Sequence, residues 1–373
     1  KMKQRRIEAF MTKSRFLTIL ALAAGLLAVV VLFCACGVPA KQAGAETARA
    51  QIAHRRDFAA GTAQEAEQQP TAEPTATPIP QPTPFSVAWM TDTQEYAANH
   101  NEVFCAMTQW IADTQSERNT LLTVHTGDLI RGSYREYEWE NMEQAFSLLP
   151  DDMMIVTVGG NHDIASYTEE YTPYLWYRPD TDVREENTFA DGFVYYTTFE
   201  AGGVPFLVIS VSYGYEIEAE DWINAVCAQN AERYAILCVH GYLDNLGFSS
   251  GGRYLFPGVV QKSPNIRLVL CGHEHGANYK PDEVDDDGDG MPDRTVHQML
   301  FNLQADEETG LGYLRMLSFD TVNDTIGVYT YSPFLDVEGY CAPDGFPIGD
   351  GFGANQTITD RKSTRLNSSH VSQ

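Results

Sequence analysis

The stretch TVGGNHD, residues 157–163, begins with the last two residues of the strand-forming run MMIVTV at 153–158. Two glycines and an asparagine tolerate the left-handed backbone of a turn, and an aspartate can cap the segment that follows. The same stretch places an amide, an imidazole and a carboxylate directly after a buried strand, where α/β proteins build their sites. The stretch alone leaves a simple turn and a ligand-bearing loop as alternatives.

Outward from this stretch, strand-like and helical patterns alternate along the chain. The strand-like runs are 85–90, 121–126, 153–158, 193–199, 205–212, 235–240, 266–271, 295–304, 314–320 and 325–332, and the helical patterns are 100–118, 134–148 and 218–230. Runs of strands mixed with amphipathic helices pack as sheets covered by helices. The sequence therefore predicts a β core of two sheets with helices on the outside.

Polar residues that can bind metal recur just past the ends of these apolar runs, in TDTQ, GD, GGNHD, HG and GHEH. They supply eight candidates: Asp92, Gln94, Asp128, Asn161, His162, His240, His273 and His275. Carboxylate and amide oxygens mixed with imidazoles suit Mn, Fe or Zn, whereas an all-oxygen set would suit Mg or Ca. Eight candidates are enough for two divalent transition metals, with one residue spared for proton transfer.

The order D-x-(H), G-D, G-N-H-(D/E), H and G-H-x-H resembles the motif series of the calcineurin-like metallophosphoesterases, from residue 86 to about 335. The resemblance implies an α+β or α/β fold of four layers, with a two-sheet β-sandwich flanked by helices. It also implies a metal-dependent hydrolase of phosphate ester bonds. In the family pattern Asp128 bridges two metals, Asp92 and His275 complete the first, and Asn161, His240 and His273 bind the second.

The family mechanism assigns the other residues of the stretch 157–163. A hydroxide that bridges the two metals attacks the phosphorus atom, and His162 acts as general acid for the departing alkoxide. Asp163 either orients that imidazole or caps the next segment. The motifs do not describe the substrate-binding loops, so monoester, diester and pyrophosphate substrates all stay open.

The chain departs from the pattern at Gln94, where the family usually has histidine. A glutamine carbonyl can still bind a metal, although less firmly than imidazole. We interpret Gln94 as a metal ligand and as the trait of an extracytoplasmic bacterial subgroup. The alternative is a non-catalytic cell-surface protein that binds phosphorylated ligands through the same metals, and a stalked adhesin would explain none of the strand-end ligands.

An acidic segment, DEVDDDGDGMPDR, has the spacing of a calcium-binding loop. Its candidate ligands are Asp285, Asp287, Asp289 and Asp293, with Gly290 at the turn. An EF-hand needs a bidentate acid at position twelve, where Val296 stands. A structural Ca²⁺ loop and a solvated acidic turn are both compatible with this segment.

The first 85 residues carry targeting signals and no pattern of a folded domain. Residues 1–36 combine a basic segment, an apolar run and small residues before Cys36, which is typical of a signal peptide with a lipobox, and translation is expected to start at Met11. An uncleaved membrane anchor is the alternative. Residues 37–85, rich in Pro, Thr, Ala and Glu, predict a disordered linker. Both alternatives place the protein outside the cytoplasm, tethered to the bacterial membrane or secreted.

The catalytic domain is predicted at 86–359. The segment DRKSTRLNSSH, residues 360–370, back-translates to a common sequencing-adapter sequence, and we expect residues 360–373 to be an artefact.

Composition narrows the partners of this domain. The chain has 25 Lys and Arg against 51 Asp and Glu, a formal net charge of −26. Such a surface repels the phosphate backbone, so no nucleic acid binding is expected, and an anionic small-molecule substrate needs local cations. Seven cysteines without a C-x-x-C pair give no disulfide framework, and Cys238 and Cys271 are predicted to be buried thiols.

Overall fold

The computed structural model describes residues 82–164, 173–304 and 312–338, and the backbone of 356–359. The predicted signal segment 1–36, nearly all of the linker and residues 360–373 lie outside the described residues, as does Cys341. In the described ranges no helix is both long enough and apolar enough to cross a membrane.

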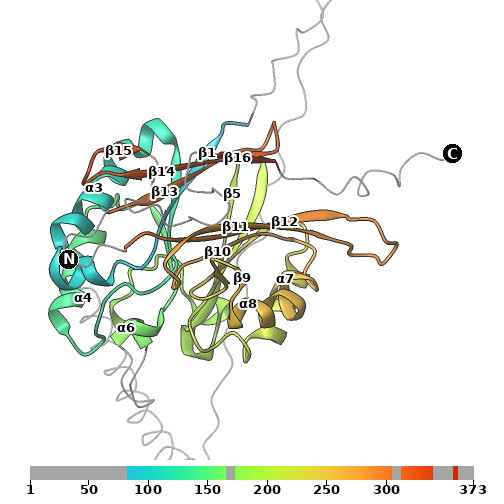
Figure 1. The fold of residues 1–373 in the computed structure, drawn as a ribbon, viewed down its shortest axis with the longest axis horizontal. Coiled ribbons are helices and arrows are strands. Elements are labelled where there is room, and N and C mark those ends of the chain that lie inside the picture. The colour runs from blue at the N-terminus through green and yellow to red at the C-terminus, as the bar shows by residue number, and fades with distance from the viewer. Residues whose placement is uncertain (1–81, 165–172, 305–311, 339–355, 360–373) are drawn as a thin grey trace, which may run out of the picture. The chain divides into compact units, whose positions relative to one another are not determined.

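The first sheet has the strand order β15-β14-β13-β1-β2-β3, with β16 also paired to β14. Its strands are β1 (Phe85–Met90), β2 (Thr120–His125), β3 (Met154–Thr157), β13 (Leu314–Asp320), β14 (Thr325–Ser332), β15 (Val337–Glu338) and β16 (Gln356–Thr359). β1, β2 and β3 are parallel, whereas β13 joins β1 antiparallel. Figure 1 shows the blue β1 beside the red-brown β13 from the far end of the chain.

The second sheet has the order β11-β12-β10-β7-β6-β5-β4, and its central strands β6, β7, β10 and β12 are parallel. Its strands are β4 (Thr188–Phe189), β5 (Val194–Ala201), β6 (Val204–Val211), β7 (Tyr234–Val239), β10 (Ile266–Cys271), β11 (Gly276–Val284) and β12 (Arg294–Asn302). A small hairpin of β8 (Leu243–Asp244) and β9 (Gly247–Phe248) follows β7.

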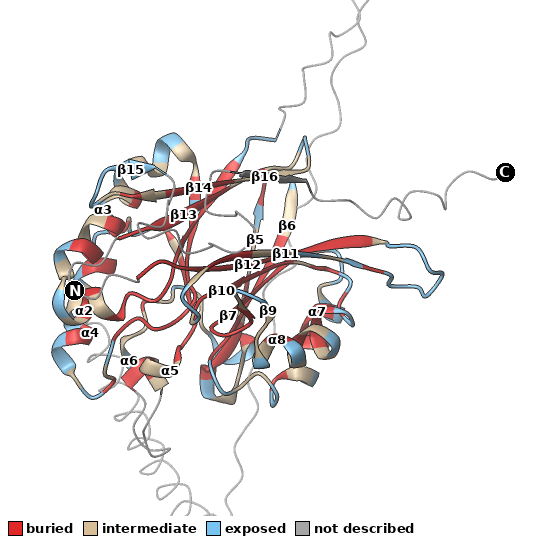
Figure 2. Ribbon diagram, in the orientation of Figure 1, coloured by how far each residue is buried: buried red, intermediate tan, exposed pale blue. Residues whose placement is uncertain are grey.

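Helices cover the outer face of each sheet. They are α2 (Gln94–Asn99), α3 (Asn101–Arg118), α4 (Glu136–Phe146), α5 (Asn161–Ile164), α6 (Pro173–Tyr177), α7 (Glu220–Gln229) and α8 (Ser250–Leu255), with short helical turns at η1 (Glu185–Asn187), η2 (Ala190–Gly192) and η3 (Phe256–Val260). Alternation along β1 shows how the layers form. Val87 and Trp89 pack between the sheets, whereas Ala88 and Met90 pack beneath the helices. In Figure 2 the central strands, such as β7, β10 and β12, are accordingly drawn mostly in the red of buried residues.

This arrangement confirms the predicted fold class of two mixed sheets flanked by helices. All ten predicted strands and all three predicted helices form, with ends shifted by at most two residues. The sequence did not predict β11, because Gly276, Lys280 and Pro281 are poor strand formers. β11 tolerates Pro281 because it is an edge strand, where a missing N–H leaves no ladder partner unpaired.

β3 is the edge strand that leads into the stretch 157–163, and a buried carboxylate holds its outer side. Asp180 accepts hydrogen bonds from the backbone N–H of Thr157, from Thr157 Oγ1 at 3.0 Å and from the Tyr195 hydroxyl at 2.7 Å. Arg178 Nε lies 3.5 Å from Asp180 Oδ2. The end of β3 is therefore fixed by side chains that are not part of the sheet.

We predict that Asp180→Ala lowers the free energy of unfolding by roughly 3–5 kcal/mol, because it removes the carboxylate that pairs with the mostly buried guanidinium of Arg178. Urea unfolding followed by circular dichroism measures the change. Asp151→Ala, in the exposed turn before β3, is the matched control and should stay within about 0.5 kcal/mol of the wild type. Equal losses in the two variants would show that Asp180 is not a special support of β3.

Candidate metal centre

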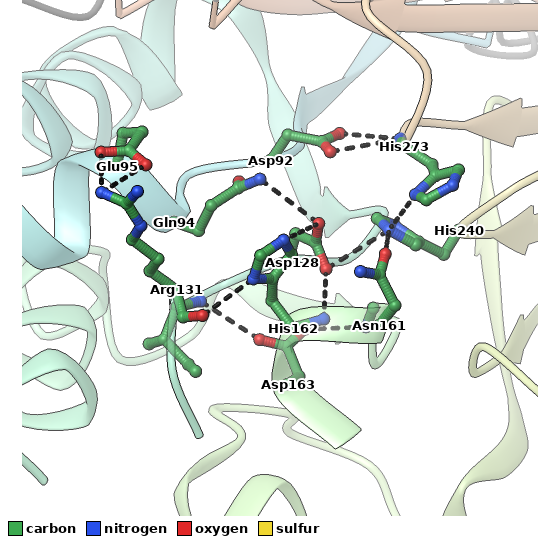
Figure 3. A network of polar contacts seen from close by, with 12 residues as sticks. Asp92, Gln94, Glu95, Asp128, Arg131, Asn161, His162, Asp163, His240 and His273 are labelled. Carbon is green, nitrogen blue, oxygen red and sulfur yellow. Dashed lines mark hydrogen bonds and ion pairs between the residues drawn. The ribbon is translucent and has the colours of Figure 1, made fainter. Parts of the chain in front are cut away.

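Loops from both sheets meet at one place, at the carboxyl ends of their parallel strands (Figure 3). Asp92 follows β1, Asp128 follows β2 and Asn161 follows β3, all from the first sheet, while His240 and His273 follow β7 and β10 of the second. Backbone hydrogen bonds link neighbouring loops within each sheet, from Asp92 N to Gly127 O at 2.9 Å and from Gly272 N to His240 O at 3.0 Å.

Three of these side chains offer ligand atoms within 4.8 Å of one another: Asp128, His240 and His273. His240 Nε2 lies 3.3 Å from Asp128 Oδ1 and 3.1 Å from His273 Nδ1. The Asn161 amide joins them, with its Oδ1 3.0 Å from His240 Nε2. One carboxylate, one amide oxygen and two imidazole nitrogens therefore converge, which is a donor set that suits a divalent transition metal.

The orientation of His240 fits a metal ligand. Its Nδ1–H donates to the Thr126 carbonyl at 2.9 Å, which directs Nε2 toward Asp128 and Asn161. Histidines that bind metals commonly donate their second N–H to a carbonyl, because this fixes the tautomer and the plane of the ring. The side chain is fully buried, so this orientation is held by packing as well.

Asp92 and Gln94 approach the same centre from the β1 loop. Asp92 accepts hydrogen bonds from His273 N at 3.0 and 3.2 Å and from Thr91 Oγ1 at 2.6 Å, and Gln94 Nε2 lies 3.3 Å from Asp128 Oδ2. Gln94 Oε1 is buried and has no hydrogen-bond partner among the described residues. A buried acceptor without a donor is costly, and a bound cation would satisfy it.

The electrostatics of the centre also favour a cation. Burial raises the pKa of Asp92 to about 7; His240 opposes this rise and Asp128 adds to it. Burial alone would lower the pKa of His240. The neighbouring carboxylate of Asp128 raises it more strongly, so the pKa of His240 is about 10. Positive charge nearby therefore stabilises the two buried carboxylates, Asp92 and Asp128. A proton on His240 supplies it in part, and a divalent metal would supply more.

Three residues of the centre share an unusual backbone conformation, which five other non-glycine residues of the described chain also adopt. Asp92, Asp128 and His273 have φ values of 49°, 57° and 70°, in the left-handed region that few residues other than glycine adopt. The backbones of Gly160 and Asp128 can lie close together because Gly160 has no side chain: a Cβ there would lie 2.2 Å from Asp128 N and Oδ1. Strain of this kind persists where the surrounding structure enforces it, and it is typical of functional sites.

His162 and Asp163 differ in their surroundings. His162 Nδ1 donates to the Arg131 carbonyl at 2.8 Å, and Nε2 lies 4.0 Å from Asp128 Oδ2. Asp163 is buried, and its carboxylate accepts hydrogen bonds from the backbone N–H groups of Gly160, Leu129 and Ile130. All three donors precede Asp163 in the chain, so these contacts join the β2 and β3 loops and do not cap the following segment, and the imidazole of His162 is oriented by the Arg131 carbonyl.

Other predicted residues are not members of the group Asp128, His240 and His273. His275 is exposed and is not in the group formed by Asp128, His240 and His273, so its role as a ligand stays a prediction. The carboxylates of Asp285, Asp287 and Asp289 lie within 4.8 Å of one another in the exposed loop between β11 and β12. Asp293 accepts from Asp286 N at 2.9 Å. The calcium loop also stays a prediction.

Tyr213 is a residue of this region that the sequence analysis missed. Its ring centroid lies 6.0 Å from that of His240 and 5.8 Å from that of His273. It follows β6 without any motif around it, so nothing in the sequence singles it out.

Comparison with protein families agrees with the fold and the centre. The model of the calcineurin-like phosphoesterase family matches residues 85–277, which contain every residue of the centre described above. The chain belongs to the calcineurin-like phosphoesterase family.

Individual relatives differ in how much they share with the chain. The uncharacterized protein YvnB of Bacillus subtilis (strain 168) is 35% identical over 283 residues, which are 74% of this chain and 22% of that protein. The serine/threonine-protein phosphatase CPPED1 of Bos taurus is 23% identical over 180 residues, 41% of this chain and 54% of that protein. The purple acid phosphatase PPD1 of yellow lupin has a solved structure with a TM-score of 0.48 and 14% identity, covering 76% of this chain and 55% of that one. The chain thus spans only part of each of these three proteins.

We predict that Asp128→Asn weakens Mn²⁺ affinity by more than about 100-fold, beyond the effect typical of changes outside the ligand set. The substitution keeps the shape of the side chain but removes the charge at the middle of the centre. Calorimetric titration of the metal-stripped full chain measures the affinity. The control is His100→Ala, which replaces a histidine just after α2 and outside the centre. This variant should bind Mn²⁺ as the wild type does. Unchanged affinity in Asp128→Asn would exclude this centre as the Mn²⁺ site.

Proposed function

We propose that the chain is a binuclear metallophosphoesterase that hydrolyses a phosphomonoester or phosphodiester. The observation that carries this proposal is the convergence of Asp128, His240 and His273 within 4.8 Å in a member of the calcineurin-like phosphoesterase family. The unpartnered buried oxygen of Gln94 supports it, because it extends the donor set toward the β1 loop.

The residues divide into two ligand groups that share Asp128. Asp92, Gln94 and His275 would hold the first metal, and Asn161, His240 and His273 the second. Bound there, the cations would neutralise charge on the phosphoryl oxygens and make hydroxide available at neutral pH. Mn, Fe and Zn are the metals that this mixture of oxygen and nitrogen donors suits.

His162 is the proton donor in this proposal. Its Nδ1–H is committed to the Arg131 carbonyl, so the proton for the leaving oxygen is carried at Nε2. The side chain is 40% exposed, which lets Nε2 reach a substrate, whereas the buried His240 cannot. Asp163 acts on the reaction only through the backbone of the two loops that it joins.

The cellular setting is a separate part of the proposal. The signal-like segment, the lipobox at Cys36 and the linker 37–85 support an extracytoplasmic enzyme tethered to the bacterial membrane or secreted. The acidic chain supports a small phosphorylated substrate and no nucleic acid. An enzyme on such a tether would meet substrates outside the cell.

Gln94 favours one alternative, a cell-surface protein that binds phosphorylated ligands without cleaving them. A neutral amide oxygen holds a borderline metal less firmly than imidazole. A weakly held first metal would leave a centre that still binds phosphate but activates water poorly.

The test is hydrolysis of a nitrophenyl phosphomonoester and a nitrophenyl phosphodiester by the full chain, stripped of metal and titrated with Mn²⁺. We expect turnover to appear with Mn²⁺ and to vanish in Asp128→Asn. The ratio of the two rates reports the substrate class. Tight binding of inorganic phosphate without cleavage of either ester would replace the enzyme by the binding protein.

For His162→Asn we predict a loss that depends on the leaving group. Cleavage of an alkyl phosphate should slow by about 100-fold or more, because its alkoxide needs a proton, whereas cleavage of a nitrophenyl ester should slow much less. Steady-state kinetics with both esters measure the difference, and His100→Asn is the control. An equal loss for the two esters would remove His162 from the role of general acid.

A further inference from the structure

A cavity of about 280 Å³ lies against the metal centre. Its walls come from the loop between β6 and α7, the loop after β7, α8 with the residue before it, and the loop after β10. His273 belongs both to this lining and to the metal-binding group, so the cavity borders the centre directly. Its volume is close to the lower end, roughly 300 Å³, of sites that bind small molecules.

The lining has a distinct charge. Glu216 and Glu274 contribute two carboxylates, and none of the described residues that line the cavity is lysine or arginine. Glu216 is half-buried, and burial raises the pKa of its carboxyl because the charge is poorly hydrated there. Glu274 is exposed at the rim, with Oε1 3.9 Å from His273 Nε2. A cation in the cavity would stabilise the carboxylate charge of Glu216, which burial disfavours.

Aromatic and apolar side chains complete the walls. Tyr213 lies beside the imidazoles of His240 and His273, and its ring is 42% exposed. Tyr254 donates its hydroxyl to Glu220, which restrains the ring, and Ile217 adds an apolar surface. Tyrosine rings attract ammonium groups through their negative faces, and alkyl substituents on nitrogen pack well against such surfaces.

We propose that this cavity binds the leaving alcohol of the phosphoester and that this alcohol carries a positively charged ammonium group. The inference rests on the proposed function and deepens it by naming the substrate class. Phosphate would be held at the metal centre, and the ammonium end would lie between the two carboxylates and the tyrosines.

The same lining argues against two other classes of substrate. A leaving group with a second phosphate, as in pyrophosphates, would meet two carboxylates with no lysine or arginine in the described lining to offset them. An uncharged polyol could use the hydroxyls of Ser249 and Ser250, but it would bring no positive charge to Glu216, which backbone N–H groups and His240 only partly stabilise. Discrimination by repulsion and by unmatched charge is a common source of specificity.

The test compares two esters that have the same shape and differ in charge. They are phosphocholine and 3,3-dimethylbutyl phosphate, measured with the Mn²⁺-loaded full chain. The two alcohols differ in intrinsic reactivity, so the quantity to follow is the ratio of their kcat/KM values in each variant. We expect Glu216→Gln to lower this ratio by about tenfold, and the double variant with Glu274→Gln to lower it further.

The matched control is Glu232→Gln, at the opposite end of β7, which removes the same charge from the chain and should keep the ratio of the wild type. A second readout avoids turnover: calorimetric titration of the metal-free chain with choline and with 3,3-dimethylbutanol. Choline should bind more tightly than the neutral alcohol, and Glu216→Gln should reduce the difference.

The outcomes separate the two proposals. If either ester is cleaved but the ratio is the same in the wild type and in Glu216→Gln, the cavity does not select a cation and the inference is overturned, while the proposed function stands. Faster cleavage of glycerol phosphate than of phosphocholine would overturn it as well. If neither these esters nor the nitrophenyl esters are cleaved, the proposed function falls, and the assignment of an ammonium group to a leaving alcohol falls with it.

Discussion

The rest of the centre depends on the contacts that the carboxylate of Asp128 makes. It is buried, and within 4.0 Å it meets groups from three other loops: Gln94 Nε2, the backbone N–H and imidazole of His162, and His240 Nε2. These groups come from both sheets, so a single charge joins the two halves of the fold at their strand ends. Burial makes that charge costly without compensation, and this cost explains why donors and imidazoles crowd around it.

The fold could largely be predicted from the sequence, because the strands are apolar on both faces and end in polar turns. Prediction failed where local preference and tertiary position disagree. β11 contains Pro281 and charged residues that only an edge strand accepts, and α8 has two glycines in its first turn. Gly252 leaves no room for a side chain, since a Cβ would lie 2.1 Å from the Tyr242 carbonyl. Such close approaches are set by the packing of distant segments, which no local pattern reports.

The site could be predicted only in part, for a similar reason. Motifs at strand ends identified Asp128, His240 and His273, because parallel strands bring their carboxyl ends to one edge. They could not identify Tyr213 or Glu216, which share a cavity with His273 only because the β6 loop lies beside the β10 loop in the folded chain. The role of Asp163 was equally hidden, since a carboxylate next to a histidine in sequence contacts the backbone instead.

β1 is held in the fold by strands that lie far from it in the chain. β1 pairs with β2 on one side and with β13 on the other, and Trp89 packs against Phe301 with ring centroids 5.5 Å apart. The family match ends at residue 277, before β12, β13 and β14. A fragment cut there would keep the ligands of the centre but would leave β1 and β10 with open edges. It would also lose eight of the 24 buried residues of the core between the sheets. The segment that the family model matches is therefore smaller than the folding unit, and β12, β13 and β14 complete the scaffold that holds the first ligand.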